Sequence, residues 1–245
     1  MSIAVTQRIR QLLCCPPKSL AAVKEAATAV EAISDKYRLT YFNLKARGEV
    51  IRFILHYSGV SFEDERVEMA DWGQFKEKNS SRLPWGNMPV LTTPDGRRLG
   101  QARAIARYLA RQFDLAGEDD VDSAAVDAVG DALEDLIIAT TPWLMSTLGD
   151  DKQAMLDQRT KLDDSGTFGK SLGRFEEMLR MNPAGWLVGS KVSWVDFQMA
   201  IWMDVYSTVD RELLADYPEL RAHANRVHAL PQLQPYLESR PETLG

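Results

Sequence analysis

Two polar stretches of this chain carry residues that could hold a small peptide. Gly86-Asn87-Met88-Pro89 comes before an apolar, strand-like run, and Gln101-Ala102 comes before a pattern of helical period. If the Met88–Pro89 bond is cis, the backbone N–H and C=O of Met88 face outward and can pair with a peptide backbone. Gln101 lies just before the first turn of the next helix, where unpaired N–H groups attract a carboxylate. An ordinary hairpin followed by a helix is the alternative interpretation.

The composition indicates a soluble globular protein and argues against several classes of function. The chain has 245 residues, 45% hydrophobic and 26% charged, which suits one or two domains. Its net charge of −6 argues against nucleic-acid binding and against a basic membrane-binding face. No stretch approaches the roughly 18 to 20 apolar residues that cross a bilayer. Cys14 and Cys15 are adjacent, so we expect no disulfide framework and favour a reducing compartment.

Residues 1–36 form an N-terminal extension ahead of the main pattern of elements. Its first part contains Arg8, Arg10 and Lys18 without an acidic residue, and Pro16-Pro17 interrupts any helix. An acid-poor, arginine-bearing start is typical of an organelle transit peptide, but the serine content here is low. We therefore expect an arm on a cytoplasmic protein, with organelle targeting as the alternative.

Residues 37–115 alternate between strand and helix patterns. Residues 37–42 alternate as a strand, residues 49–57 have a helical apolar face, and residues 62–69 can form a second strand after a parallel crossover. After an irregular segment over 70–85, a strand, the turn Pro94-Asp95-Gly96, another strand and a helix follow. This order predicts a thioredoxin-like βαβ-ββα domain.

Residues 121–245 follow an acidic linker and are helical in period, which predicts an all-helical domain and a fold class of α/β plus all-α. Asp127, Asp131 and Asp135 recur at every fourth position of the first helix, and Pro142 should kink or end it. Ser193-Trp194-Val195-Asp196 resembles a capping box. The strongly apolar helix that follows should be the buried axle of this domain.

Several motifs, in register from about residue 37 to residue 241, resemble those of glutathione S-transferases, and the sigma class, which includes the haematopoietic prostaglandin D synthases, is the most similar. The motifs are Tyr41-Phe42, Ala46-Arg47-Gly48-Glu49, Met69-Ala70-Asp71-Trp72, Met88-Pro89-Val90-Leu91, Gln101 with residues 104–109, Trp186-Leu187-Val188-Gly189 and Ser193-Trp194-Val195-Asp196-Phe197. The resemblance implies a homodimeric transferase with glutathione as co-substrate and no required metal. Its thiolate would attack a hydrophobic electrophile, and the isomerisation of prostaglandin H2 to D2 is a narrower possibility.

The resemblance also implies a role for each matched residue. Tyr41 would donate its hydroxyl to the glutathione sulfur, and lowering the thiol pKa by two units takes about 2.7 kcal/mol of differential stabilisation. Arg47 would support the thiolate. The implied glutathione-binding residues are Tyr41, Arg47, Trp72, Lys76, Gly86, Asn87, Met88, Pro89, Gln101, Ala102 and, reaching across the dimer, Asp135. The implied electrophile pocket is lined by Phe42, Leu44, Ile138 and Trp143.

Alternatives stay open for several of these residues. Tyr41 could be an inward-facing strand aromatic, with Tyr37 as a competing tyrosine at the other end of the strand. The aspartate row could be a solvated helix face. Asp131, Glu134 and Asp135, together with their two-fold mates, could instead bind a divalent ion.

Two departures from the family pattern bear on activity. Relatives usually have serine where this chain has Ala102, and losing one charge-assisted hydrogen bond costs on the order of 1.5 to 3 kcal/mol in binding. A non-catalytic glutathione- or ligand-binding protein of the same fold, such as the crystallins of this family or a scaffold, is therefore the alternative function. The order Ala46-Arg47-Gly48 replaces the usual Gly-Arg-Ala, a swap of small residues that should preserve close approach.

Overall fold

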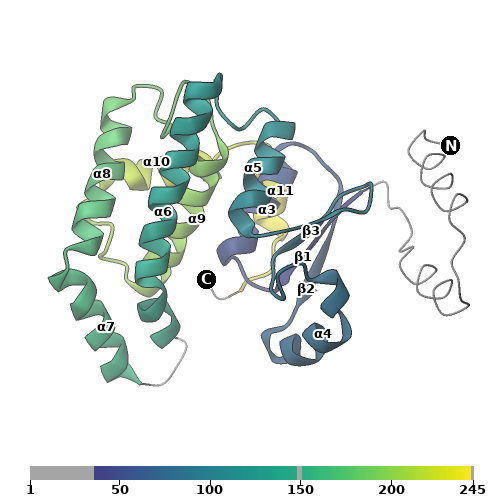
Figure 1. The fold of residues 1–245 in the computed structure, drawn as a ribbon. Coiled ribbons are helices and arrows are strands. Elements are labelled where there is room, and N and C mark those ends of the chain that lie inside the picture. The colour runs from purple at the N-terminus through teal and green to yellow at the C-terminus, as the bar shows by residue number, and fades with distance from the viewer. Residues whose placement is uncertain (1–35, 148–150, 244–245) are drawn as a thin grey trace, which may run out of the picture.

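The computed structural model describes residues 36–147 and 151–243, which form an α/β domain beside a helical domain (Figure 1). The predicted extension over 1–36 lies outside the described residues except for Lys36. The first strand begins at Tyr37, as the sequence predicts. The predicted end of the first domain, residue 115, lies after α5, which ends at Gln112, and the predicted start of the second, residue 121, lies one residue inside the first long helix, which begins at Asp120.

The α/β domain is built on a four-stranded sheet in the order β2-β1-β3-β4. Its strands are β1 (Tyr37–Phe42), β2 (Phe62–Val67), β3 (Val90–Thr92) and β4 (Arg98–Gly100). β1 pairs in parallel with β2 and antiparallel with β3, with Leu39 opposite Asp64 and Leu91. Helices α3 (Ala46–Tyr57) and α5 (Ala102–Gln112) complete the predicted βαβ-ββα order. The thioredoxin-like prediction is therefore confirmed.

Two local predictions in this domain need correction. Helix α3 begins at Ala46 rather than at residue 49, so Arg47 and Gly48 belong to its first turn and not to a loop. The segment over 70–85 is also less irregular than predicted. It contains the short helices η1 (Met69–Asp71), α4 (Trp72–Lys78) and η2 (Ser80–Arg82). None of the residues in these three helices is buried. The segment therefore has no buried apolar face, and its sequence shows no clear helical period.

The C-terminal domain is helical throughout its regular elements, as predicted. It contains α6 (Asp120–Ser146), α7 (Lys152–Asp164), α8 (Thr167–Met181), α9 (Trp194–Val209), α10 (Pro218–His228) and α11 (Gln234–Ser239). The prediction that Pro142 could end its helix is wrong, because α6 continues through it to Ser146. Thr141 donates its hydroxyl to the Ile137 carbonyl at 2.7 Å, and Trp143 beyond the proline is buried, so packing holds the helix together.

Helix α9 is the buried axle that its apolar sequence predicts. Most of its residues are buried, and the predicted capping box is present, with Ser193 and Asp196 as its two members. The Asp196 carboxylate also accepts a hydrogen bond from the Leu187 N–H at 2.9 Å and lies 2.8 Å from His223 Nε2. One buried carboxylate therefore joins the start of α9, the loop before it and α10.

Apolar contacts between α3 and α9 help to join the two domains. The rings of Phe53 and Phe197 lie 6.1 Å apart, and Tyr57 lies 5.2 Å from Phe197. Helix α11 then returns the chain to α3, beside which it lies in Figure 1. Over the residues the structure describes, no helix combines the length and the apolar character that crossing a bilayer requires.

We predict that Asp196→Ala lowers the free energy of unfolding by about 3 to 5 kcal/mol, because it leaves several buried donors without their acceptor. Chemical denaturation of the two proteins measures this difference. Asp163→Ala is the control, since it removes an exposed ion pair with Arg159 and should cost less than about 1 kcal/mol. Equal losses in both variants would contradict the role given to Asp196.

Candidate functional site

Tyr41 lies near the carboxyl end of β1 with only 5% of its surface exposed. Its ring packs against the backbone of Gly48, where an added Cβ atom would lie 2.1 Å from Tyr41 Cδ1. The Arg52 guanidinium carbon lies 5.9 Å from the ring centroid. Two residues of α3, Gly48 and Arg52, therefore contact the Tyr41 ring. The close approach at position 48 requires a glycine.

The electrostatic setting keeps the Tyr41 hydroxyl protonated. Burial raises the pKa of Tyr41, and this outweighs the charge and backbone N–H of Arg47 and the charge of Arg52, which lower it. The hydroxyl therefore acts as a hydrogen-bond donor at neutral pH. A neutral donor of this kind stabilises an anion more than the corresponding neutral acid. Tyr37, the competing tyrosine, lies at the start of the strand and packs its ring 6.3 Å from Phe113.

Arg47 lies in the first turn of α3 and its side chain remains 39% exposed. Its guanidinium forms an ion pair with Glu134, which is buried on the inner face of α6. Arg47 thus follows Tyr41 by six positions in the chain and binds the helical domain through a charge-assisted hydrogen bond. From the sequence, Glu134 is predicted only as a candidate metal ligand, and its pairing with Arg47 is not predicted. The available signal was an acidic residue within the apolar stripe of α6.

Trp72, Lys76 and Gly86 gather beside Phe42. The Phe42 and Trp72 rings lie 5.5 Å apart, and Lys76 Nζ lies 5.7 Å from the Trp72 ring. A Cβ atom added to Gly86 would come within 4.0 Å of the Lys76 side chain. The structure thus brings together three predicted glutathione-binding residues from two separate segments, on the same strand end as Tyr41.

The other predicted binding residues lie at the turn into β3 and at the start of α5. The Met88–Pro89 bond is cis, the geometry for which an outward-facing Met88 backbone is expected. Asn87 is exposed, whereas Met88 and Pro89 are buried. Gln101 precedes α5 with φ of 71°, and its side chain makes no capping hydrogen bond to that helix. Ala102 opens the helix with 9% of its surface exposed.

The residues predicted for the electrophile pocket do not all face the same way. Phe42 and Leu44 are half-buried at the end of β1, and Ile138 on α6 is 57% exposed. Trp143 is 3% exposed and lies 5.6 Å from Phe168, inside the helical domain. Phe42, Leu44 and Ile138 therefore remain available to a ligand, while Trp143 belongs to the core around α6 and α8.

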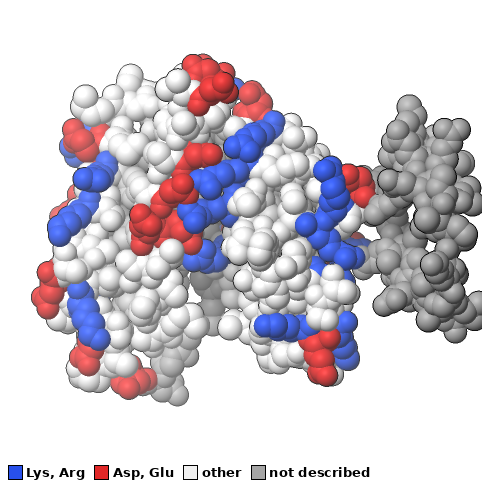
Figure 2. Space-filling model, in the orientation of Figure 1, with Lys and Arg blue, Asp and Glu red and all other residues white. Residues whose placement is uncertain are grey.

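The aspartate row of α6 faces a row of arginines on α5, and blue and red side chains meet there in Figure 2. Arg107 Nε lies 2.9 Å from Asp127 and its Nη2 lies 2.7 Å from Asp131, which Arg103 also contacts. These carboxylates are therefore neutralised by arginines rather than solvated alone. Among the described residues, no three His, Cys, Asp or Glu side chains form a metal-binding group. Asp135, predicted to reach across a dimer, is exposed.

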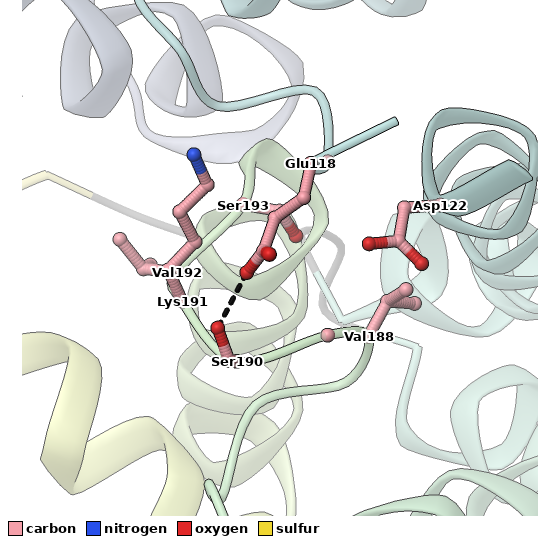
Figure 3. Close-up of a pocket in the computed structure, with 9 residues that line it drawn as sticks. Glu118, Asp122, Val188, Ser190, Lys191, Val192 and Ser193 are labelled. Atoms are coloured by element: carbon pink, nitrogen blue, oxygen red, sulfur yellow. Dashed lines mark hydrogen bonds between the residues drawn. The ribbon is translucent and has the colours of Figure 1, made fainter. Parts of the chain in front are cut away.

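A separate hollow lies between the start of α6 and the loop before α9 (Figure 3). It is lined by Glu118, Asp122 and the segment over 188–193. Ser190 donates a hydrogen bond to Glu118, and the nearby Lys191 pairs with Asp114 at 2.7 Å. None of the predicted site residues lines this hollow, so it does not belong to the site around Tyr41.

We predict that Gly48→Ala lowers the free energy of unfolding by about 1 to 3 kcal/mol, because its methyl group needs space that the Tyr41 ring occupies. Thermal and denaturant unfolding measure the change. Gly173→Ala in α8 is the matched control, since nothing lies within 4 Å of the added atom. That substitution should stabilise the helix by up to about 1 kcal/mol. A Gly48→Ala variant as stable as Gly173→Ala would contradict the contact.

Comparison with known proteins identifies the family. Two family models, described as the glutathione S-transferase N-terminal domain and C-terminal domain, match residues 37–111 and 139–240. The chain is 35% identical over 208 residues to probable glutathione S-transferase 6 of Caenorhabditis elegans, covering 84% of this chain and 97% of that protein. It is also 35% identical over 213 residues to human hematopoietic prostaglandin D synthase, covering 84% and 98%.

A solved structure of the glutathione S-transferase from Ascaris lumbricoides superposes on this fold. Its TM-score is 0.74 at 32% sequence identity, with 85% of this chain and 98% of that chain covered. The sequence comparisons and the structural comparison therefore point to the same family over both domains. The chain belongs to the glutathione S-transferase family, as an enzyme that uses glutathione as its co-substrate.

Proposed function

We propose that this transferase activates glutathione at Tyr41 and delivers the thiolate to a hydrophobic electrophile. The observation that carries the proposal is a buried, protonated Tyr41 hydroxyl near the end of β1, the strand that precedes the helix on which Arg47 lies. A thiol has a pKa of roughly 8.5, so little thiolate exists at neutral pH without stabilisation. The hydroxyl would donate to the sulfur, and Arg47 would add positive charge nearby.

Glutathione would lie along the sheet edge between two groups of residues. Trp72 and Lys76 would hold its glycyl end, and the Met88 backbone, flanked by Gly86, Asn87 and Pro89, would pair with its cysteinyl part. Gln101 and the Ala102 N–H would hold the γ-glutamyl carboxylate at the start of α5. The Gln101 side chain, which makes no capping bond to α5, and the proximity of Trp72, Lys76 and Gly86 support this arrangement.

The electrophile would bind beside Phe42 and Leu44, with Ile138 on the facing helix. In conjugation, the sulfur–carbon bond forms as the electrophile's leaving group departs. Isomerisation of prostaglandin H2 to D2 is a second candidate, favoured by the similarity to human hematopoietic prostaglandin D synthase. Membership of the sigma class is part of the same proposal.

We further propose a homodimer in which Asp135 of one subunit reaches the glutathione amine bound to the other. The exposure of Asp135, on a helix whose neighbouring aspartates are paired with arginines, supports this role. A cytoplasmic location is proposed from Cys14 and Cys15, whose adjacency in the sequence argues against a disulfide framework.

We predict that Tyr41→Phe lowers the rate of conjugation to a chloronitrobenzene acceptor up to about 100-fold at pH 7, as expected for losing a two-unit shift of the thiol pKa. The deficit should shrink as the pH rises past the pKa of the free thiol, because the thiolate then forms without help. Tyr37→Phe, at the other end of β1, is the matched control and should retain activity. Equal rates for wild type and Tyr41→Phe at pH 7 would remove Tyr41 from its role.

The conjugation assay, together with a glutathione-binding assay and a prostaglandin isomerisation assay, tests the alternative that the protein binds glutathione without turnover. A wild-type protein that is retained on immobilised glutathione but shows no conjugation and no prostaglandin isomerisation would favour a binding protein of this fold. Turnover with either acceptor would exclude that alternative.

We predict that Ala102→Ser lowers the KM for glutathione about tenfold or more, because the new hydroxyl can donate to the γ-glutamyl carboxylate. The value of kcat should change little, since that carboxylate is remote from the sulfur. Steady-state kinetics with varied glutathione measures both parameters. Ala104→Ser, exposed on the same helix, is the control and should leave KM unchanged. An unchanged KM in Ala102→Ser would contradict the placing of the carboxylate.

A further inference from the structure

A network of charged residues on α3 lies beside the Tyr41 ring. The side chains of Glu49 and Arg52 are both fully buried and form an ion pair of 3.1 Å. Buried charges are costly unless every one is paired and hydrogen-bonded. The contacts of these two residues therefore show what the network holds in place.

Arg52 binds the loop that joins Tyr41 to Arg47. Its Nη1 donates to the Leu44 carbonyl at 2.8 Å, and its Nη2 donates to the Phe42 carbonyl at 3.2 Å. Its Nε donates to Asp64 on β2 at 3.0 Å. One guanidinium thus fixes two backbone carbonyls on the residues that follow Tyr41, and it lies beside the Tyr41 ring as well.

Glu49 connects this network to residues near the C-terminus. Its Oε1 accepts a hydrogen bond from the Tyr236 hydroxyl at 2.9 Å and lies 3.2 Å from Arg240 Nη1. The Tyr236 ring is itself held, because it stacks on His56 with the ring centroids 4.2 Å apart. Helix α11 and the residue after it therefore supply two of the three groups that bind this buried carboxylate.

We propose that Tyr236 and Arg240 are positioning residues for Tyr41. By binding one oxygen of Glu49, they leave the other to orient Arg52, which in turn holds the Phe42 and Leu44 carbonyls and hence the tyrosine. Without them Glu49 would draw Arg52 toward itself, and the loop would lose its fixed anchor. This inference rests on the proposed role of Tyr41. It adds that the C-terminal helix, though absent from the glutathione site, sets the geometry of the catalytic hydroxyl.

The test is Tyr236→Phe in the full-length protein, which removes one hydroxyl and leaves the ring. The ionisation of bound glutathione is followed by thiolate absorbance across pH, together with kcat and KM. We expect the bound thiol pKa to rise by about half a unit or more, and kcat at pH 7 to fall about threefold or more. The KM for glutathione should be nearly unchanged, because its binding residues lie elsewhere. Arg240→Gln should act in the same direction, and Arg240→Lys should restore most of the loss.

Tyr206→Phe is the matched control, since it also removes a buried hydroxyl, one that lies 2.8 Å from Thr140 within the helical domain. It should cost stability without moving the bound thiol pKa. An unshifted thiol pKa in Tyr236→Phe and Arg240→Gln, with Tyr41→Phe inactive, would overturn this inference alone. A Tyr41→Phe variant as active as the wild type would instead overturn the proposed function. Equal pKa shifts in Tyr206→Phe and Tyr236→Phe would show a general loss of stability and also overturn the inference.

Discussion

The site depends on one constraint, which is that the buried Arg52 guanidinium must have its hydrogen bonds satisfied. An arginine with no exposed side-chain surface must find a hydrogen-bond acceptor for each of its nitrogens. It finds them in Glu49, in Asp64 and in two backbone carbonyls, that of Phe42 at the end of β1 and that of Leu44 in the loop that follows. The strand, the loop, helix α3 and, through Glu49, the C-terminal helix therefore share one set of contacts. A displacement of any one of them would leave a buried charge unpaired, which is far more costly than an exposed one.

A second constraint is the packing of Tyr41 against the first turn of α3. Ala46 has φ of 35°, a conformation that glycine adopts more readily, while the glycine of the motif stands at position 48. The swap of small residues thus has a physical consequence at each end. Ala46 has a strained backbone conformation. Gly48 has no side chain, so the Tyr41 ring can approach the helix closely. The expectation of close approach holds, and its structural location is Gly48.

Ion pairs from α3 and α5 to α6 also join the two domains. Arg47 on Glu134 and Arg107 on Asp131 connect residues of the glutathione-binding domain to the first helix of the helical domain. Exposed pairs contribute little singly, but buried Glu134 is a different case, because its charge needs Arg47. The arginine proposed to support the thiolate is thus also a structural partner, and the acidic cluster is occupied by arginines.

Family resemblance implied the motif residues around Tyr41, and the sequence by itself determined the order of the four strands with α3 and α5 and the buried axle with its capping box. These depend on local period and on residue types at short spacing, which a single chain displays directly. Only the tertiary structure decided that Glu134 pairs with Arg47, that Trp143 faces the helical core and that α6 continues through Pro142. It alone joined Tyr236 to Glu49, since residues so far apart in the chain meet only when two domains pack. Local pattern specifies which face of a helix is apolar, but the partner of each buried charge is set by what packs against it.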